Sequence, residues 1–157
     1  MKKEIKISKN YEGLELKDGV YHYTDDLKID CNASIYEDLI INGDLVVAGN
    51  LTCHKDLKVL GSIFVCGDLT AAGNVSADEV IVDGDVLINE SLDVELFCVH
   101  GNITVNGNLK TRRVSSCYGN VKTYNLVSDD YIYVGGNIDI KGKMYAPLQE
   151  GLFNTCR

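Results

Sequence analysis

A short repeated phrase, aliphatic-x-aliphatic-x-Gly-Asp/Asn, runs from about Leu27 to Met144 and limits the possible folds more than any other feature. Two apolar residues two positions apart place their side chains on one face of a β-strand. Glycine followed by Asp or Asn suits a sharp bend, and we expect these glycines to have left-handed backbone. Many short strands separated by similar bends predict a β-solenoid.

The first apolar residue of each unit recurs every 17 or 18 residues when every third unit is compared. We therefore predict an all-β, three-sided, single-stranded β-solenoid with 17–18 residues per coil. With strands about 4.8 Å apart, roughly seven coils give a rod about 35 Å long. The three series of first residues are Leu45, Ile63, Val80, Phe97, Val114 and Ile132; Leu51, Leu69, Val86, Ile103, Val121 and Ile138; and Leu57, Val75, Leu92, Leu109, Leu126 and Met144.

Two kinds of corner support this assignment. Three steps from the third series to the first contain only five residues, and they end at Val80, Phe97 and Val114. The corner between the first and second series repeats Gly-Asp or Gly-Asn, which predicts the same bend on consecutive coils and hydrogen bonds along the stack. These pairs are Gly49-Asn50, Gly67-Asp68, Gly84-Asp85, Gly101-Asn102, Gly119-Asn120 and Gly136-Asn137.

Residues 1–157 are predicted to form a single domain, because a hydrophobic content of 45% can build one continuous core and no linker composition interrupts it. Residues 1–26 are expected to form an N-terminal cap or first coil, 27–146 the solenoid repeats, and 147–157 a C-terminal tail or cap. The first residues lack the apolar stretch of a signal peptide, and no stretch has the length and apolarity of a transmembrane segment. The expected location is cytoplasmic.

The six cysteines lack zinc-like spacing and are predicted to be free thiols in a reducing compartment. Cys53 is expected to point inward, Cys98 outward, Cys156 to lie in the tail, and Cys31, Cys66 and Cys117 to lie at corners.

No residue pattern in the chain is typical of catalysis. His22, His54 and His100 are expected to be separate surface histidines. The corners differ from calcium-binding nonapeptide repeats, which need paired Gly-x-Asp turns, and the repeats lack the protruding loop of the hexapeptide acyltransferases. We therefore expect no enzyme activity, no cofactor, and no catalytic, cofactor-binding or metal-binding residues.

The chain is acidic, with 15 Lys and Arg against 23 Asp and Glu and a net charge of −8, which argues against direct binding of nucleic acid. Either this charge keeps the rod soluble, or it imitates nucleic acid and blocks a nucleic-acid-binding protein. Lys110, Arg112, Arg113 and Lys122 interrupt the acidic pattern. The acidic residues of the middle coils are Asp68, Asp78, Glu79, Asp85, Glu90, Asp93 and Glu95.

One face of the prism is predicted to carry apolar side chains on its outside. The residues between its two inward positions are Val46, Phe64, Ile81, Cys98, Ser115 and Tyr133, whereas the other two faces mostly carry Thr, Lys, Ser or Asp there. An apolar row on a flat sheet is typical of a contact surface, unless a terminal segment of the same chain folds back over it. The predicted partner-binding residues are Val46, Phe64, Ile81, Cys98 and Tyr133.

The runs from Val75 to Val86 and from Val99 to Leu109 resemble the bactofilins, polymer-forming bacterial cytoskeletal proteins. The similarity extends over roughly Leu39 to Met144. The resemblance implies a right-handed β-helix that assembles end to end into nucleotide-independent filaments and acts as a scaffold at the membrane.

Two functions therefore remain open. The first is a non-enzymatic scaffold that acts by self-assembly or protein–protein binding in the bactofilin manner; its partner is itself or another protein, and it reaches a membrane only through assembly. The second is an acidic protein-binding inhibitor, of the nucleic-acid-mimic or phage anti-defence type, that acts as a discrete particle. Covered ends favour the particle and open ends favour the filament.

Overall fold

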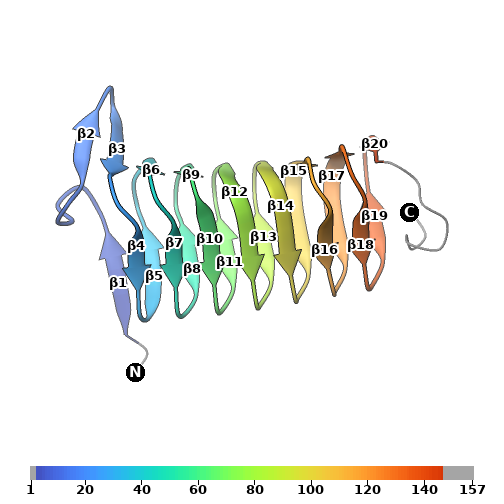
Figure 1. The fold of residues 1–157 in the computed structure, drawn as a ribbon, viewed down its shortest axis with the longest axis horizontal. Coiled ribbons are helices and arrows are strands. Elements are labelled where there is room, and N and C mark those ends of the chain that lie inside the picture. Colours follow the sequence, from blue (N-terminus) through green and yellow to red (C-terminus); the bar gives the residue numbers. More distant parts are fainter. Residues whose placement is uncertain (1–2, 147–157) are drawn as a thin grey trace.

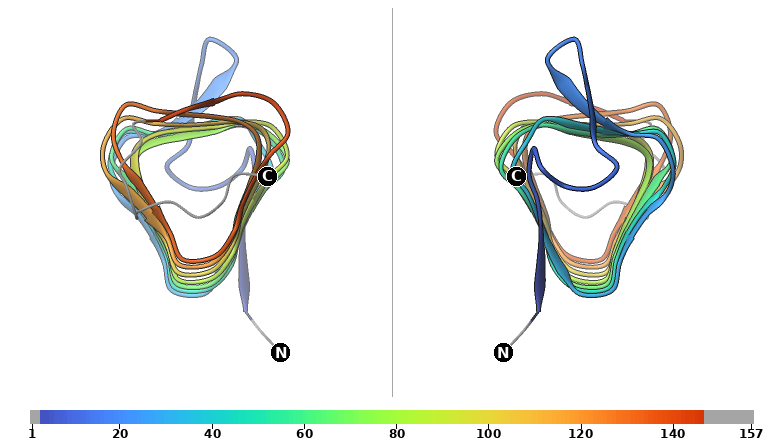
Figure 2. Two further views of the ribbon diagram at one scale, coloured as in Figure 1. Left: turned by 90° about the vertical axis from the view of Figure 1, so that its right-hand side faces the viewer. Right: turned by 90° about the vertical axis from the view of Figure 1, so that its left-hand side faces the viewer.

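The computed structural model describes residues 3–146, which wind into a rod of short β-strands (Figure 1). The rod is a β-solenoid of about seven turns with about 18 residues per turn, which confirms the predicted fold class. Seen along its axis, the rod is triangular in cross-section (Figure 2). Among residues 3–146, no helix is long and apolar enough to span a lipid bilayer.

Each turn contributes one strand segment to each of three faces. Face 1 contains β4 (Leu27–Ile29), β7 (Leu45–Val47), β10 (Ser62–Val65), the ends of β12 (Val75–Val82) and β14 (Leu92–Val99), β16 (Ser115–Cys117) and β18 (Ile132–Val134). Face 2 contains β1 (Glu4–Ile7), β5 (Asn32–Ile35), β8 (Leu51–Cys53), β11 (Leu69–Ala71), β13 (Val86–Ile88), the beginnings of β15 (Ile103–Thr111) and β17 (Val121–Ser128), and β19 (Ile138–Ile140). Face 3 contains β3 (Val20–Tyr23), β6 (Leu39–Ile41), β9 (Leu57–Val59), the beginnings of β12 and β14, the ends of β15 and β17, and β20 (Met144–Tyr145).

The core is a stack of side chains contributed by all three faces. In β8, for example, Leu51 and Cys53 are buried, whereas Thr52 between them is partly exposed. Strands on one face pair in parallel, so Leu69 lies in register with Leu51 on one side and with Val86 on the other. Each such side chain is packed from both neighbouring coils, and its burial stabilises the fold by about 1.5–3 kcal/mol.

The corner between faces 1 and 2 is held by a ladder of Asp and Asn side chains. The backbone N–H of Asp85 donates to Oδ1 of Asp68, and that of Asn102 donates to Oδ1 of Asp85, both over 2.8 Å. The same bond repeats on each coil from Asn32 to Asn137. The side-chain oxygens thus supply acceptors for N–H groups at the bend, where the strand ladder does not. The predicted stacking of these corners is confirmed.

The reason for glycine at these corners differs from the predicted one. Among the described residues, positive φ occurs only at Gly13, Asp18 and Gly19 in the N-terminal segment, so left-handed backbone at the stacked corners was a wrong prediction. Glycine is needed there because adjacent coils approach closely. A Cβ atom on Gly101 would meet Oδ1 of Asp85 and would lie 2.5 Å from the carbonyl oxygen of Gly84.

The predicted register is wrong by one residue at β16. Val114 is 45% exposed, whereas Ser115 is buried, pairs with Ile132 and takes the inward position. The preceding corner holds one residue more than the corner below it, because the N–H groups of Arg112 and Arg113 both donate to the carbonyl oxygen of Glu95. This arrangement is that of a β-bulge. The step from Leu109 therefore ends at Ser115, and the outward residue is Ser116 instead of Ser115.

Ser115 is inward because its hydroxyl group completes the hydrogen bonds around this bulge. Its Oγ accepts from the backbone N–H of Phe97 over 3.1 Å and lies 2.7 Å from Oγ1 of Thr111. It also donates to the carbonyl oxygen of Arg113 over 3.1 Å. A buried valine at this position would leave the N–H of Phe97 without this acceptor.

The N-terminal end of the rod is covered by the chain itself. Figure 2 shows the segment between β1 and β2 (Glu15–Lys17) crossing the mouth of the prism. Tyr11 and Leu14 in this segment pack against the core, and burial raises the pKa of Tyr11. On face 3, β2 pairs antiparallel with β3 and continues the sheet beyond the first coil. This end therefore has a cap instead of a bare coil.

We predict that Val86→Asp destabilises the protein by about 3–5 kcal/mol, because it buries a charge that has no partner. Leu87→Asp serves as the matched control, since Leu87 is adjacent but faces outward and is 41% exposed. Urea unfolding followed by circular dichroism measures both. Equal losses of stability would show that the inward and outward assignment is wrong.

We predict that Gly101→Ala costs about 1–3 kcal/mol through steric overlap with the coil below. Because φ at Gly101 is not positive, alanine has no conformational penalty of its own there. Thr70→Val on the outside of face 2 should change stability by less than about 0.5 kcal/mol. An unchanged unfolding midpoint for Gly101→Ala would mean that the corner accommodates a methyl group.

We predict that Ser115→Ala costs about 1–3 kcal/mol, because the buried N–H of Phe97 loses its acceptor. Ser116→Ala is the control, since Ser116 is adjacent and faces outward. Thermal or urea unfolding distinguishes the two. A larger loss of stability at Ser116 than at Ser115 would support the register in which Val114 points inward.

Candidate functional site

Face 1 carries a straight row of outward side chains, here called the central row. Phe64 pairs with Val46 on one side and with Ile81 on the other, and Ile81 pairs with Cys98. These four apolar residues are all partly exposed. Neighbouring residues in the row are one strand spacing apart, about 4.8 Å. The central row is Lys28, Val46, Phe64, Ile81, Cys98, Ser116 and Tyr133, in which Lys28 at the N-terminal end is the charged member.

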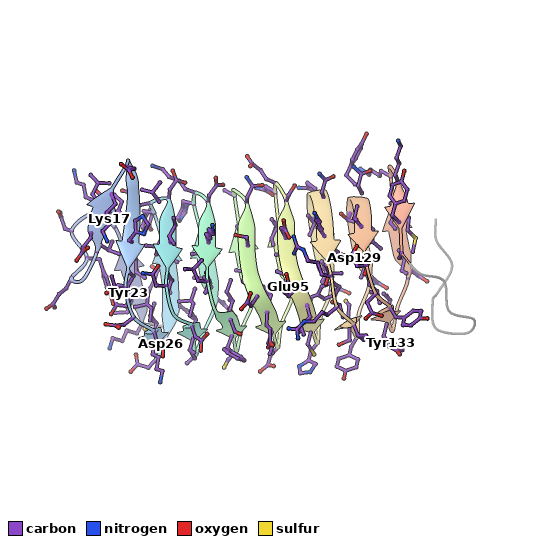
Figure 3. The ribbon with its side chains drawn as sticks, turned by 45° about the horizontal axis from the view of Figure 1, so that its top comes forward. Lys17, Tyr23, Asp26, Glu95, Asp129 and Tyr133 are labelled. Atoms are coloured by element: carbon purple, nitrogen blue, oxygen red, sulfur yellow. The ribbon has the colours of Figure 1, made fainter. Side chains whose placement is uncertain are left out.

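The structure brings the five residues predicted for partner binding onto this one face. Four of them are consecutive, and Ser116 separates Cys98 from Tyr133. Tyr133 is 41% exposed. Figure 3 shows Tyr133 and Asp26, which precedes β4, toward opposite ends of the rod, so they mark the two ends of face 1. Within residues 3–146, no strand lies on top of the central row.

A second row, here called the corner row, follows the strands of face 1. The N–H of His100 donates to the carbonyl oxygen of Val82 in the coil below, and Cys66, Asp83 and Tyr118 make the equivalent bond in their coils. The corner row comprises these four residues; Ala48 and Gly135 make the same bond in the coils beyond its two ends.

His100 was expected to be a separate surface histidine, but its ring has two partners. Its Nδ1 lies 3.1 Å from Oδ1 of Asp83, and the ring stacks on Tyr118 with centroids 5.1 Å apart. Similarly, His54 stacks on Tyr36 with centroids 4.4 Å apart. The corner row is therefore an ordered edge of face 1, and it ends in Tyr118, which is 63% exposed.

A third row, here called the leading row, precedes the buried residues of face 1. Glu79 pairs with Ser62 and with Leu96, and Val114 occupies the same position before β16. Sequence reasoning missed Leu96, Val114 and Tyr118 as parts of this surface. These residues come just before or just after the inward–outward–inward residues of each face 1 strand. The period of the repeat therefore did not predict where their side chains point.

The acidic residues of the middle coils are largely engaged within the protein. Asp68 and Asp85 belong to the corner ladder. Nη1 of Arg112 lies 2.7 Å from Oδ1 of Asp93 and 3.4 Å from Oε1 of Glu95, and the hydrogen bond to Asp93 raises the pKa of Arg112. Nη2 of Arg113 lies 3.6 Å from Oε1 of Glu79. Such exposed ion pairs stabilise little, but they partly neutralise the acidic surface.

The cysteines divide into buried and accessible thiols. Cys53 points inward as predicted, and burial raises its pKa to about 12. Cys117 was predicted at a corner but is also inward, because it follows the shifted register of β16; burial raises its pKa to about 11. Cys66 is exposed and Cys98 is partly exposed, both on face 1, whereas Cys156 lies outside the described residues.

The described residues contain no cluster of His, Cys, Asp or Glu of the kind that holds a metal ion. A groove of about 500 Å³ lies at the N-terminal end of the central row. Val46, Ala48 and the charged Lys28 and Asp30 line it on face 1, together with Ile5 and Tyr11 of the N-terminal segment. Face 1 thus combines an apolar strip with a recess that has both apolar and charged walls.

Comparisons of the chain with protein-family models, curated proteins and solved structures find no match. The part of the bactofilin resemblance that holds is the β-solenoid of about seven turns.

Proposed function

We propose that this protein is a non-enzymatic β-solenoid scaffold that assembles with itself through face 1, in the cytoplasm. The observation that carries this proposal is the central row, in which Val46, Phe64, Ile81 and Cys98 are aligned and partly exposed on consecutive coils. Water is excluded most effectively when such a row meets another flat apolar surface.

The composition of face 1 supports a protein partner. Interfaces are enriched in aromatic residues and depleted of lysine and acidic residues at their centre. Phe64, Tyr118 and Tyr133 lie on face 1, whose central row carries one charged residue, Lys28 of the first coil. The equivalent outward positions of faces 2 and 3 include Lys58, Lys110, Lys122, Asp93 and Asp139. Removing face 1 from water therefore costs less desolvation free energy than removing face 2 or face 3.

The N-terminal cap favours lateral assembly over the end-to-end filament that the bactofilin resemblance implies. Stacking of coil on coil needs an open strand edge at both joined ends. Here residues 8–14 cross the mouth of the prism, and β2 extends face 3 beyond the first coil. An assembly through face 1 leaves this cap undisturbed.

The alternative of an acidic inhibitor has less support. Of its seven predicted acidic residues, Asp68 and Asp85 hold the corner ladder, and Glu79, Asp93 and Glu95 pair with Arg112 or Arg113. Mimicry of nucleic acid needs carboxylates that are free to meet a basic partner. Most of these carboxylates already have an internal function.

We predict that Phe64→Lys together with Ile81→Lys abolishes self-association while the fold is retained, because neither side chain enters the core. Light scattering coupled to size-exclusion chromatography, over a range of protein concentrations, measures association, and circular dichroism measures folding. Lysine is chosen because it moves the net charge from −8 to −6, so a loss of association cannot result from added general repulsion.

The matched control is Thr70→Lys together with Leu87→Lys, a pair of outward residues in register on face 2 of the same rod. It should associate like the unmodified chain. A folded face 1 variant that still associates, or an unmodified chain that stays monomeric at every concentration, would refute the proposed function. Filaments in electron micrographs that persist in the face 1 variant would favour end-to-end assembly.

A further inference from the structure

We infer that face 1 pairs with the same face of a second copy in antiparallel order, about a two-fold axis that lies parallel to the strands between β12 and β14. This inference rests on the proposed function and adds the symmetry and register of the assembly. A closed two-fold dimer is the commonest form of homo-oligomer, and it requires a surface that is complementary to itself.

The central row has this self-complementarity. A two-fold axis parallel to the strands reverses the order of coils but keeps each row opposite the same row of the other copy. Ile81 then faces Cys98 of the second copy, and Phe64 faces Ser116. Val46 faces Tyr133 at the far end. Every pair contains at least one apolar side chain. Lys28, the charged residue of the row, lies beyond the Val46–Tyr133 pair and has none of these residues opposite it.

The corner row supplies hydrogen-bonding complementarity in the same register. Asp83 of one copy faces His100 of the other, and the reciprocal pair lies across the axis. Within each copy, Asp83 and His100 are already 3.1 Å apart, so carboxylates and imidazoles alternate across the axis. On the leading row, Glu79 faces Leu96. No two like charges oppose each other in these three rows.

Two other two-fold arrangements bring like charges together. An axis along the rod would place the leading row against the corner row of the same coil, so that Glu79 would face Asp83. An antiparallel arrangement with its axis through β12 would place Asp83 against Asp83 and Glu79 against Glu79. Like charges in apposition disfavour an interface, so the axis between β12 and β14 is favoured over these two. It is also the axis that places Asp83 opposite His100.

The groove at the N-terminal end fits the opposite end of a second copy. It has a volume of about 500 Å³, and Val46, Ala48, Lys28 and Asp30 line it on face 1. In the proposed register, Val46 faces Tyr133 of the second copy, which is 41% exposed. A tyrosine ring that packs on apolar side chains, with its hydroxyl group toward polar groups and water, is a common anchor of interfaces. Two such anchors would hold the two ends of the dimer.

The area of contact predicts a weak dimer. Six strand segments, from β7 to β18, span about 29 Å at a spacing of about 4.8 Å, and one side of a turn is about 20 Å wide at about 3.3 Å per residue. Both copies together would bury about 1,200 Å², which is the lower limit for specific interfaces. Association should therefore depend on concentration in the micromolar range.

Exchange of the charges at the axis tests this arrangement. Asp83→Lys alone and His100→Glu alone should each weaken the homodimer about tenfold. Lysine at position 83 removes the carboxylate that faces His100, and glutamate at position 100 faces Asp83 across the axis. An equimolar mixture of the two variants should form a heterodimer about as tightly as the unmodified chain, since Lys at position 83 then faces Glu at position 100. Native mass spectrometry of the full chain distinguishes the heterodimer from both homodimers by mass.

A mixture of Leu87→Lys and Thr104→Glu is the matched control, because these outward residues of face 2 are in register on the same two coils. It should show only the statistical proportion of heterodimer. Circular dichroism verifies that each variant is folded.

One outcome would overturn the arrangement and leave the proposed function in place. In it, Asp83→Lys and His100→Glu form only the statistical proportion of heterodimer, whereas Phe64→Lys with Ile81→Lys still abolishes association. An unmodified chain that remains monomeric would overturn both.

Discussion

The hydrogen bond from a backbone N–H to the Asp or Asn oxygen of the preceding coil is the interaction on which the rest of the molecule depends. At a corner the strand ladder is interrupted, and the bending backbone still needs acceptors. Asp68 and Asp85 provide them only because Gly84 and Gly101 have no side chain in the narrow space between coils. This spacing keeps each coil above the last, so residues 17 or 18 positions apart form straight rows, and a row of outward apolar residues becomes a continuous surface.

The repeat made most of this arrangement predictable. The period identified three faces, the inward residues and the row from Val46 to Cys98, because alternation in a strand depends only on sequence position. It failed at Ser115, where a hydroxyl group that satisfies buried backbone occupies a position for which the pattern favours an apolar residue. It also failed for the glycines, because a close approach of two coils and a left-handed bend select the same residue. The partners of His100 lie one coil away on either side, and the sequence alone did not show which corner residues share a row.

The two ends and three sides of the rod therefore have different properties. The N-terminal end is covered by its own chain, faces 2 and 3 carry mostly polar and charged side chains, and face 1 combines Phe64 and Ile81 with the tyrosines of the last coils. The acidic net charge is distributed mainly over corners, where Asp side chains have a structural function. Outward apolar side chains are thus concentrated on one side of the rod, and the lateral association proposed above uses that side.

The coil-on-coil bonding also determines how the chain reaches its native state. Although every strand pair except β2–β3 is parallel, partners are only 17 or 18 residues apart, which for 157 residues gives a relative contact order of about 0.11. That value is typical of helical bundles, whereas β-sandwiches have larger ones. The N-terminal cap completes the first coil before later coils are synthesised, so each new coil finds a finished template. Folding can then proceed from the capped end as the chain leaves the ribosome, with one coil exposed at a time.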